Sequence, residues 1–261
     1  MIMDRIETIQ APLLDDIAHG FLGRSGGISS GLYASLNVGL GSDDDAAAVA
    51  ENRRRAVAAV LPGAALVTLH QIHSANVVSA TEPWPGNRRP HADGVVTDQP
   101  DLLLGILTAD CVPVLFADAA RGIVGAAHAG WKGALGGVTD NVIAAMVALG
   151  AQRDAIVAAI GPCIGRASYE VSDGFLAAFA DADPANERFF TGGKPRHHYF
   201  DIEAYVVARL HDGGVGRVAA LGHDTYANPG RFFSYRRSCH AGEKDYGRQI
   251  SLIGITPKRQ M

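Results

Sequence analysis

The chain has 261 residues, a hydrophobic share of 48% and a formal net charge of −4 at pH 7. An apolar share of this size fills a sizeable core and excludes a disordered chain. A mildly acidic chain also lacks the broad basic surface that nucleic-acid backbones attract, so nucleic acid is not expected as a partner.

The cysteines and the most apolar stretch predict the compartment. Cys111, Cys163 and Cys239 are few, odd in number and far apart, which is typical of a reducing compartment rather than a disulfide framework. Residues 102–131 are interrupted by charged residues such as Asp110 before the roughly 18 apolar residues of a membrane span accumulate. We therefore expect a cytoplasmic protein without a membrane partner.

The first third of the chain predicts a turn followed by a helix. Residues 23–31 are rich in glycine and cannot form a helix, and residues 32–40 are expected to be extended or looped. Ser42 and the acids after it supply a helix start. The helix is expected to run to about Leu61 and to carry Arg53 on its way.

The middle of the chain predicts strands and the rest adds helices. Short apolar runs separated by turn residues predict strands at about 65–69, 76–80, 93–97, 102–108, 112–117 and 122–127. Helical patterns cover about 134–149, 172–182 and 201–212, and short apolar runs also occur at 155–160 and 217–221. This order predicts an α+β or layered α/β fold. Without repeats or linkers, residues 1–261 are expected to form one domain.

Three residues at predicted strand ends form a candidate metal site. Cys111 and His128 end successive apolar runs, so adjacent strands would bring them to one rim, and His73 lies at another strand edge before a turn. Two imidazoles and a thiolate suit zinc and leave a fourth position open. The spacing alone leaves the alternative of ordinary core residues open, because no CxxC or HExxH pattern is present.

Seven motifs occur in one order along the chain. They are QIH at 71–73, ADGVVT at 92–97, TADCVP at 108–113, HAGWKG at 128–133, IGPCIG at 160–165, YEV at 169–171 and FFSYRR at 232–237. Together they resemble the polyphenol oxidase (laccase-domain) family, also called the peptidoglycan editing factor family. The sequence departs from the family pattern at Ser74, at 224–226 and at 239–244, and none of these departures touches His73, Cys111 or His128.

The resemblance implies a fold and a metal. The fold it implies is a layered α/β/β/α sandwich like the catalytic domain of a cytotoxic necrotising factor. It also implies a zinc ion held by His73, Cys111 and His128. His73 is chosen over His70, because the position equivalent to His70 varies in the family.

The resemblance also implies phosphorolysis of adenosine, inosine, guanosine and methylthioadenosine, accompanied by adenosine deamination. Purine nucleosides and phosphate are thus the expected partners. Phosphate held against C1′ calls for cations, and the candidates are Arg24, Arg53 and Arg236. Asp110 is a candidate for proton handling or for supporting a ligand. Trp131 is expected to pack more than to stack on a base.

Three other functions remain open at this point. Cys111 and His128 could form a nucleophile pair in a hydrolase or amidase that acts on peptidoglycan precursors. The site could also be vestigial in a scaffold protein. A copper polyphenol oxidase is disfavoured, because its copper sites need about ten histidines in tight His-x-His patterns, whereas the ten histidines here include no His-x-His.

Overall fold

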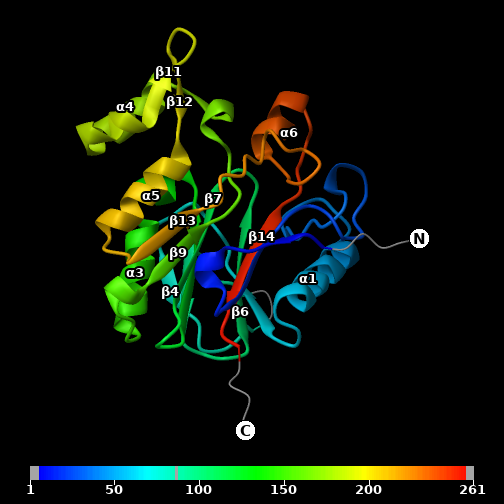
Figure 1. Ribbon diagram of the computed structural model, residues 1–261. Helices are drawn as coiled ribbons and strands as arrows, with labels where there is room; N and C mark the ends of the chain where they lie inside the picture. Colours follow the sequence, from blue (N-terminus) through cyan, green and yellow to red (C-terminus); the bar gives the residue numbers. More distant parts are fainter. Residues whose placement is uncertain (1–5, 86–87, 257–261) are drawn as a thin grey trace.

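Two β-sheets stacked face to face form the centre of the computed structural model, which describes residues 6–85 and 88–256 (Figure 1). In sheet order, the five-stranded sheet contains β1 (Thr8–Ile9), β2 (Ala18–Leu22), β14 (Gln249–Gly254), β6 (Leu102–Thr108) and β3 (Ala65–Thr68). The six-stranded sheet contains β13 (Arg217–Ala220), β9 (Val157–Ile160), β7 (Val112–Asp118), β8 (Ile123–Ala129), β5 (Gly94–Thr97) and β4 (Val77–Ser79).

The strands of the six-stranded sheet are buried on both faces. In β7, Leu115 and Ala117 belong to the apolar cluster between the sheets. Val114 and Phe116 point the other way, into the cluster beneath the helices. Because successive side chains of a strand alternate between faces, a strand covered on both sides is apolar throughout. This explains the uninterrupted apolar run that predicted the strand.

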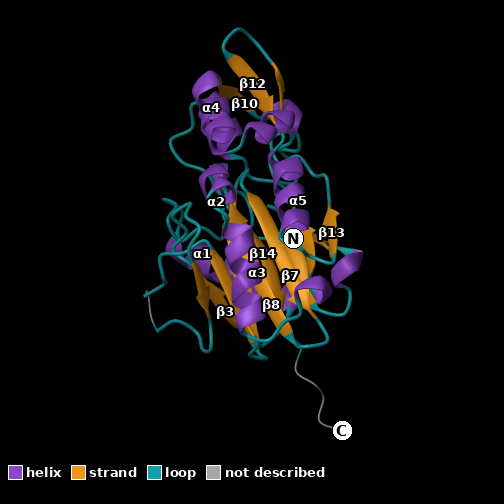
Figure 2. Cartoon of the chain, turned by 90° about the vertical axis from the view of Figure 1, so that its left-hand side faces the viewer, coloured by secondary structure: helices purple, strands orange, loops and turns teal. Residues whose placement is uncertain are grey.

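Helices cover the outer faces of both sheets (Figure 2). Helix α1 (Ala46–Val60) packs on the five-stranded sheet through Ala56, which shares a cluster with Leu103 and Leu252. Helices α3 (Val138–Ala148) and α5 (Ile202–Asp212) pack on the six-stranded sheet. The predicted mixed α/β fold is confirmed. The likeness to a cytotoxic necrotising factor and the single domain over 1–261 stay predictions.

A small third sheet was not predicted. It contains β10 (Glu170–Ser172), β12 (His197–Phe200) and β11 (Phe190–Gly192), and with α4 (Asp173–Ala182) it forms the upper end of the molecule in Figures 1 and 2. The sequence analysis also missed β2, β14 and α6 (Tyr235–Ala241). Three-residue strands carry too little alternation to be recognised from the sequence.

The predicted start of helix α1 is confirmed, since Asp45 is one of the acids expected to supply it, whereas another predicted helix was wrong. Helix α1 begins at Ala46, because the Asp45 carboxylate caps it by accepting a hydrogen bond from the backbone N–H of Ala47. The helix predicted over 134–149 is two helices, α2 (Trp131–Leu135) and α3, which are separated at Gly137 with a φ of +88°. Glycine adopts that left-handed conformation without steric cost.

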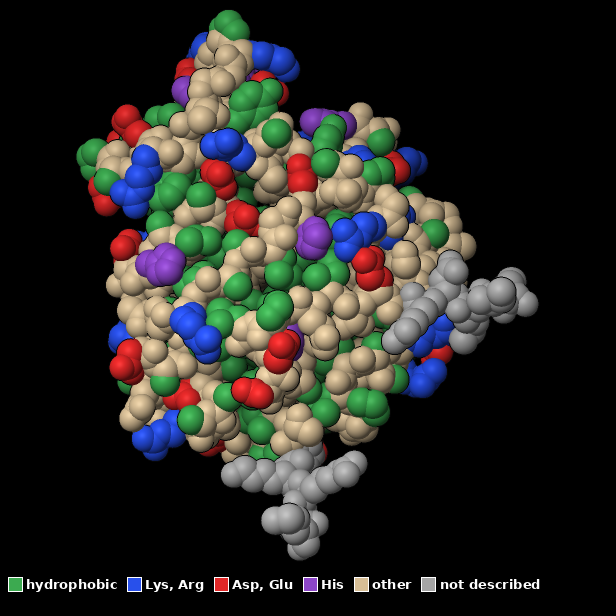
Figure 3. All heavy atoms as spheres, in the orientation of Figure 1, with side chains coloured by type: hydrophobic (Ala, Val, Ile, Leu, Met, Phe, Trp, Pro, Cys, Tyr) green, Lys and Arg blue, Asp and Glu red, His purple; other side chains and the backbone are tan. Residues whose placement is uncertain are grey.

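The molecule has no continuous basic patch on the face drawn in Figure 3, where Lys and Arg side chains are interspersed with acidic ones. Within residues 6–85 and 88–256, no helix combines the length and the hydropathy that crossing a membrane would require. Cytoplasmic localisation itself stays a prediction.

Candidate active site

The register of two antiparallel strands brings Cys111 and His128 together. Strands β7 and β8 pair with Val112 opposite Ala129, so Cys111, just before β7, lies at the same sheet edge as His128 near the end of β8. The sequence predicted this meeting at one rim. It placed the end of the second strand two residues early, since β8 continues through His128 to Ala129.

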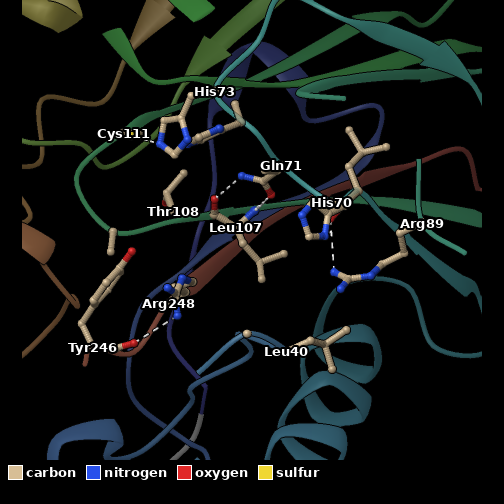
Figure 4. Close-up of a pocket in the computed structure, with 14 residues that line it drawn as sticks. Leu40, His70, Gln71, His73, Arg89, Leu107, Thr108, Cys111, Tyr246 and Arg248 are labelled. Carbon is tan, nitrogen blue, oxygen red and sulfur yellow. Dashed lines mark hydrogen bonds between the residues drawn. The ribbon is translucent and has the colours of Figure 1, made fainter. Parts of the chain in front are cut away.

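His73 reaches the same edge on a loop that follows β3. Its backbone is left-handed, with φ at +60°. The loop is fixed by Gln71, whose side-chain amide donates to the Leu107 carbonyl (2.7 Å) and accepts from the Leu107 N–H (2.9 Å) (Figure 4). This double hydrogen bond ties the loop to β6, the neighbour of β3 in the five-stranded sheet.

The side-chain atoms of His73, Cys111 and His128 form a compact set of metal donors. All three donor atoms lie within 4.8 Å of one another, and Cys111 Sγ is 3.9 Å from His73 Nε2. A tetrahedral zinc ion holds such ligand atoms roughly 3.5 Å apart. Gly130 leaves the space for them, because a Cβ there would lie 2.7 Å from His73 Cδ2 and 3.1 Å from Cys111 Sγ. The donor set and its spacing therefore fit a metal ion.

Asp93 organises this site. Its Oδ1 lies 2.8 Å from His128 Nδ1, so the other ring nitrogen of His128 is available to a metal. The same carboxylate accepts hydrogen bonds from the backbone N–H groups of Ile72, His73 and Ser74. Metal-binding histidines commonly have such a carboxylate partner. The sequence analysis missed this residue, although it lies in the ADGVVT motif and is the first residue of the strand predicted over 93–97.

The site favours a charged form of its thiol. Burial opposes ionisation of Cys111, but His128 and His73 more than offset it and lower the pKa of the thiol to about 6. Burial also opposes protonation of His128, yet the Cys111 thiolate and Asp93 raise the pKa of that imidazole to about 9. Without a metal, the pair is a thiolate and an imidazolium. A metal ion would displace the proton of His128, because only the neutral ring is a ligand.

A charged cavity of about 260 Å³ borders the three residues (Figure 4). Its polar lining includes His70, Gln71, Arg89, Thr108 and Arg248. Arg89 Nε and Thr108 Oγ1 are buried there without a hydrogen-bond partner among the described residues. The Arg248 guanidinium stands 4.1 Å from the centre of the Tyr246 ring. We call this the charged cavity.

An aromatic cavity of about 460 Å³ shares His73, Ala109 and Cys111 with the charged cavity. Its other walls come from α2, the small sheet, α4 and α6, and include Trp131, Tyr169, Glu170, Phe175, Tyr235 and Arg236. Two of the three candidate metal ligands, His73 and Cys111, therefore lie between the two cavities. We call this second space the aromatic cavity.

Two of the predicted phosphate-binding arginines, Arg53 and Arg24, line neither cavity. Arg53 donates to Thr68 Oγ1 (2.8 Å), and burial, followed by repulsion from Arg89, lowers its pKa to about 10. Arg24 donates to the Ala34 carbonyl (2.8 Å). The sequence analysis did not identify Arg89 and Arg248, which do line the charged cavity.

Arg236 and Asp110 do reach the site, on the side of the aromatic cavity. The buried Asp110 carboxylate accepts hydrogen bonds from Thr225 Oγ1 (2.6 Å), Ser234 Oγ (3.0 Å) and the backbone N–H of Arg236 (2.7 Å). Burial raises its pKa against the effect of these bonds. Through these bonds Asp110 connects the turn next to Cys111 with the start of α6. Its role in proton handling stays a prediction.

Comparison with known proteins shows the family. Residues 18–256 match the family model described as multi-copper polyphenol oxidoreductase laccase. The chain belongs to this family. The family prediction from the seven motifs is thereby confirmed, and the match includes His73, Cys111 and His128.

Family relatives carry the name of a different activity. A Deinococcus radiodurans protein named purine nucleoside phosphorylase is 40% identical over 257 residues, which cover 97% of this chain and 94% of that protein. A Streptomyces griseus protein named purine nucleoside phosphorylase ORF3 is 39% identical, covering 89% and 94%. The crystal structure of Neisseria meningitidis protein NMB0706 superposes with a TM-score of 0.87 at 36% identity, over 97% and 100% of the two chains.

Proposed function

We propose that this protein is a zinc-dependent purine nucleoside phosphorylase that cleaves adenosine, inosine, guanosine and methylthioadenosine in the cytoplasm. The observation that carries the proposal is the site itself: three metal donors border a cavity that holds buried polar groups without partners. The names of the relatives support the same activity. Zinc is favoured over copper, because the ten histidines include no His-x-His pattern.

Phosphate would occupy the charged cavity. Arg89 Nε is a buried donor without a partner among the described residues, and Arg248 supplies a second guanidinium. Guanidinium groups bind phosphate oxygens through charge-assisted hydrogen bonds, and the Thr108 hydroxyl adds a further donor. We therefore assign phosphate to Arg89 and Arg248, which line the charged cavity, rather than to Arg24 or Arg53, which do not line it.

In phosphorolysis, a phosphate oxygen forms a bond to C1′ as the bond from C1′ to the purine nitrogen breaks. The purine leaves with the electron pair, and positive charge develops on the ribose. The arginines hold the attacking oxygen in position before the reaction, which lowers the entropic part of the barrier. A bound zinc ion would supply Lewis acidity at the shared wall of the two cavities.

Adenosine deamination is proposed as an accompanying activity, in which water rather than phosphate attacks the substrate at C6 of the base and the 6-amino group leaves as ammonia. This part of the proposal rests on the family resemblance. It is measured by the appearance of inosine in reactions without phosphate.

The test is a phosphate-dependence assay on zinc-loaded protein, with metal content measured by elemental analysis. We expect one zinc ion per chain and the release of adenine and ribose 1-phosphate from adenosine only when phosphate is present. Release of adenine at the same rate without phosphate would refute phosphorolysis. Full activity on a diphenol with copper, and none on nucleosides, would restore the oxidase hypothesis.

A second candidate function is supported by the thiolate and imidazolium pair. Cys111, His128 and Asp93 form the chain of nucleophile, base and orienting carboxylate that cysteine hydrolases use. A hydrolase or amidase acting on peptidoglycan precursors would retain its activity after metal removal and lose it on alkylation by iodoacetamide. The phosphorylase would lose activity on metal removal alone and regain it with zinc.

A further inference from the structure

The aromatic cavity has flat walls next to the candidate metal site. The Trp131 and Phe175 ring centres are 4.9 Å apart, and Tyr169 meets Phe175 edge to face at 5.9 Å. All three side chains are only partly buried, so part of each remains accessible. Aromatic walls of this kind bind planar heterocycles by stacking.

One residue that lines this cavity has a polar atom without a partner. Glu170 lines the cavity, and its Oε1 is buried without a hydrogen bond from any described residue. Its other oxygen lies 3.4 Å from Nζ of the exposed Lys194. The backbone is fixed, because Glu170 pairs with Tyr199 across the small sheet and its carbonyl accepts from Arg236 Nη1 (2.8 Å). A buried carboxylate oxygen without a donor is costly, so a ligand that brings an N–H gains affinity there.

We propose that the aromatic cavity is the subsite for the purine base and that Glu170 Oε1 accepts a hydrogen bond from an N–H on the edge of its six-membered ring. That donor is the 6-amino group of adenine, or N1–H of hypoxanthine and guanine. The inference rests on the proposed function, since a purine is the expected occupant of this cavity only if nucleosides react at the wall that it shares with the charged cavity.

The stereochemistry of displacement supports this assignment. The attacking phosphate and the leaving base must lie on opposite sides of C1′. The charged and the aromatic cavity meet at His73, Ala109 and Cys111, so a nucleoside at this wall can have phosphate on one side and base on the other. Arg236, 5.4 Å from the Tyr169 ring centre, adds a cation where the leaving base gains electrons.

The test compares binding of two free bases, adenine and unsubstituted purine, which lacks the 6-amino group. Calorimetry on zinc-loaded protein needs no turnover. A hydrogen bond to a charged group contributes on the order of 10-fold to 100-fold in affinity, so the unaltered protein is expected to prefer adenine by about that ratio. In Glu170→Ala the ratio of the affinity for adenine to that for purine should fall to nearly one. Glu170→Gln, whose amide oxygen still accepts, should retain part of it.

Lys194→Ala is the matched control, because it removes the neighbouring charge but leaves Oε1 in place; it should keep the preference for adenine. Thermal unfolding of each variant shows whether the fold is kept. Equal weakening of both bases in Glu170→Ala, or an unchanged preference, would overturn the inference.

The same measurements separate this inference from the proposed function. A preference for adenine that depends on Glu170, in a protein that releases no base when phosphate is added, would support the base subsite and refute the phosphorylase. Phosphate-dependent release of adenine, with a preference that Glu170→Ala leaves intact, would support the phosphorylase and refute the base subsite.

Discussion

The charged and the aromatic cavity share one wall but are built from different parts of the chain. The charged cavity is lined by loops and strand ends of the five-stranded sheet, such as Thr108 at the end of β6 and Arg248 just before β14. The aromatic cavity is lined by the small sheet, α4 and α6. An anion fits the first and a planar ring the second. Substitutions in the shared wall should therefore affect both phosphate and the purine base. Substitutions in one cavity should affect only the ligand of that cavity.

The largest effect is expected from Cys111→Ala, which removes a donor from the shared wall. Loss of a metal that contributes several kcal/mol to transition-state stabilisation lowers the rate by about 10³-fold. The zinc content measured by elemental analysis and the rate of nucleoside turnover should fall together. Cys239→Ala, at the exposed cysteine of α6, should change neither. A metal-free Cys111→Ala protein with normal turnover would show that the wall does not act through a metal.

Asp93→Asn should weaken metal binding less than Cys111→Ala, because all three metal ligands remain and only the carboxylate that orients His128 changes. Replacing the carboxylate that orients a metal-binding histidine typically weakens metal affinity about 10-fold to 100-fold. Competition with a zinc chelator measures that affinity. Asp98→Asn makes the same change of charge at an exposed position after β5 and should leave it unaltered. Equal zinc affinity in both variants would contradict the role given to Asp93.

The smallest effect should come from Arg89→Ala, which changes the charged cavity alone. Loss of a charge-assisted hydrogen bond should raise the KM for phosphate by roughly 10-fold, with little change in the KM for adenosine. Arg88→Ala is the matched control, since Arg88 is exposed and does not line the cavity. If the KM for adenosine rose instead, phosphate would have been assigned to the wrong cavity.

Prediction from the sequence was most successful where the signal is local. The bounds predicted for β6, residues 102–108, agree with the structure, because a buried strand is a continuous apolar run between turns. Strands β10 to β12 and the break at Gly137 escaped prediction. Short strands carry almost no periodic signal. The Gly136-Gly137 pair is a turn signal, but the predicted helix ran through it.

The sequence by itself determined the family, the mixed α/β class and the motifs that contain His73, Cys111 and His128. Only the tertiary structure showed that His73 and Cys111 lie in a wall shared by two cavities, that His128 lines one of them, and that Asp93 supports the site. The same is true of Arg89, Arg248 and Glu170. Their positions depend on contacts between segments far apart in the chain, as between Gln71 and Leu107. Local sequence patterns carry no record of such contacts, because they form only when strands that are distant in the sequence pair with one another.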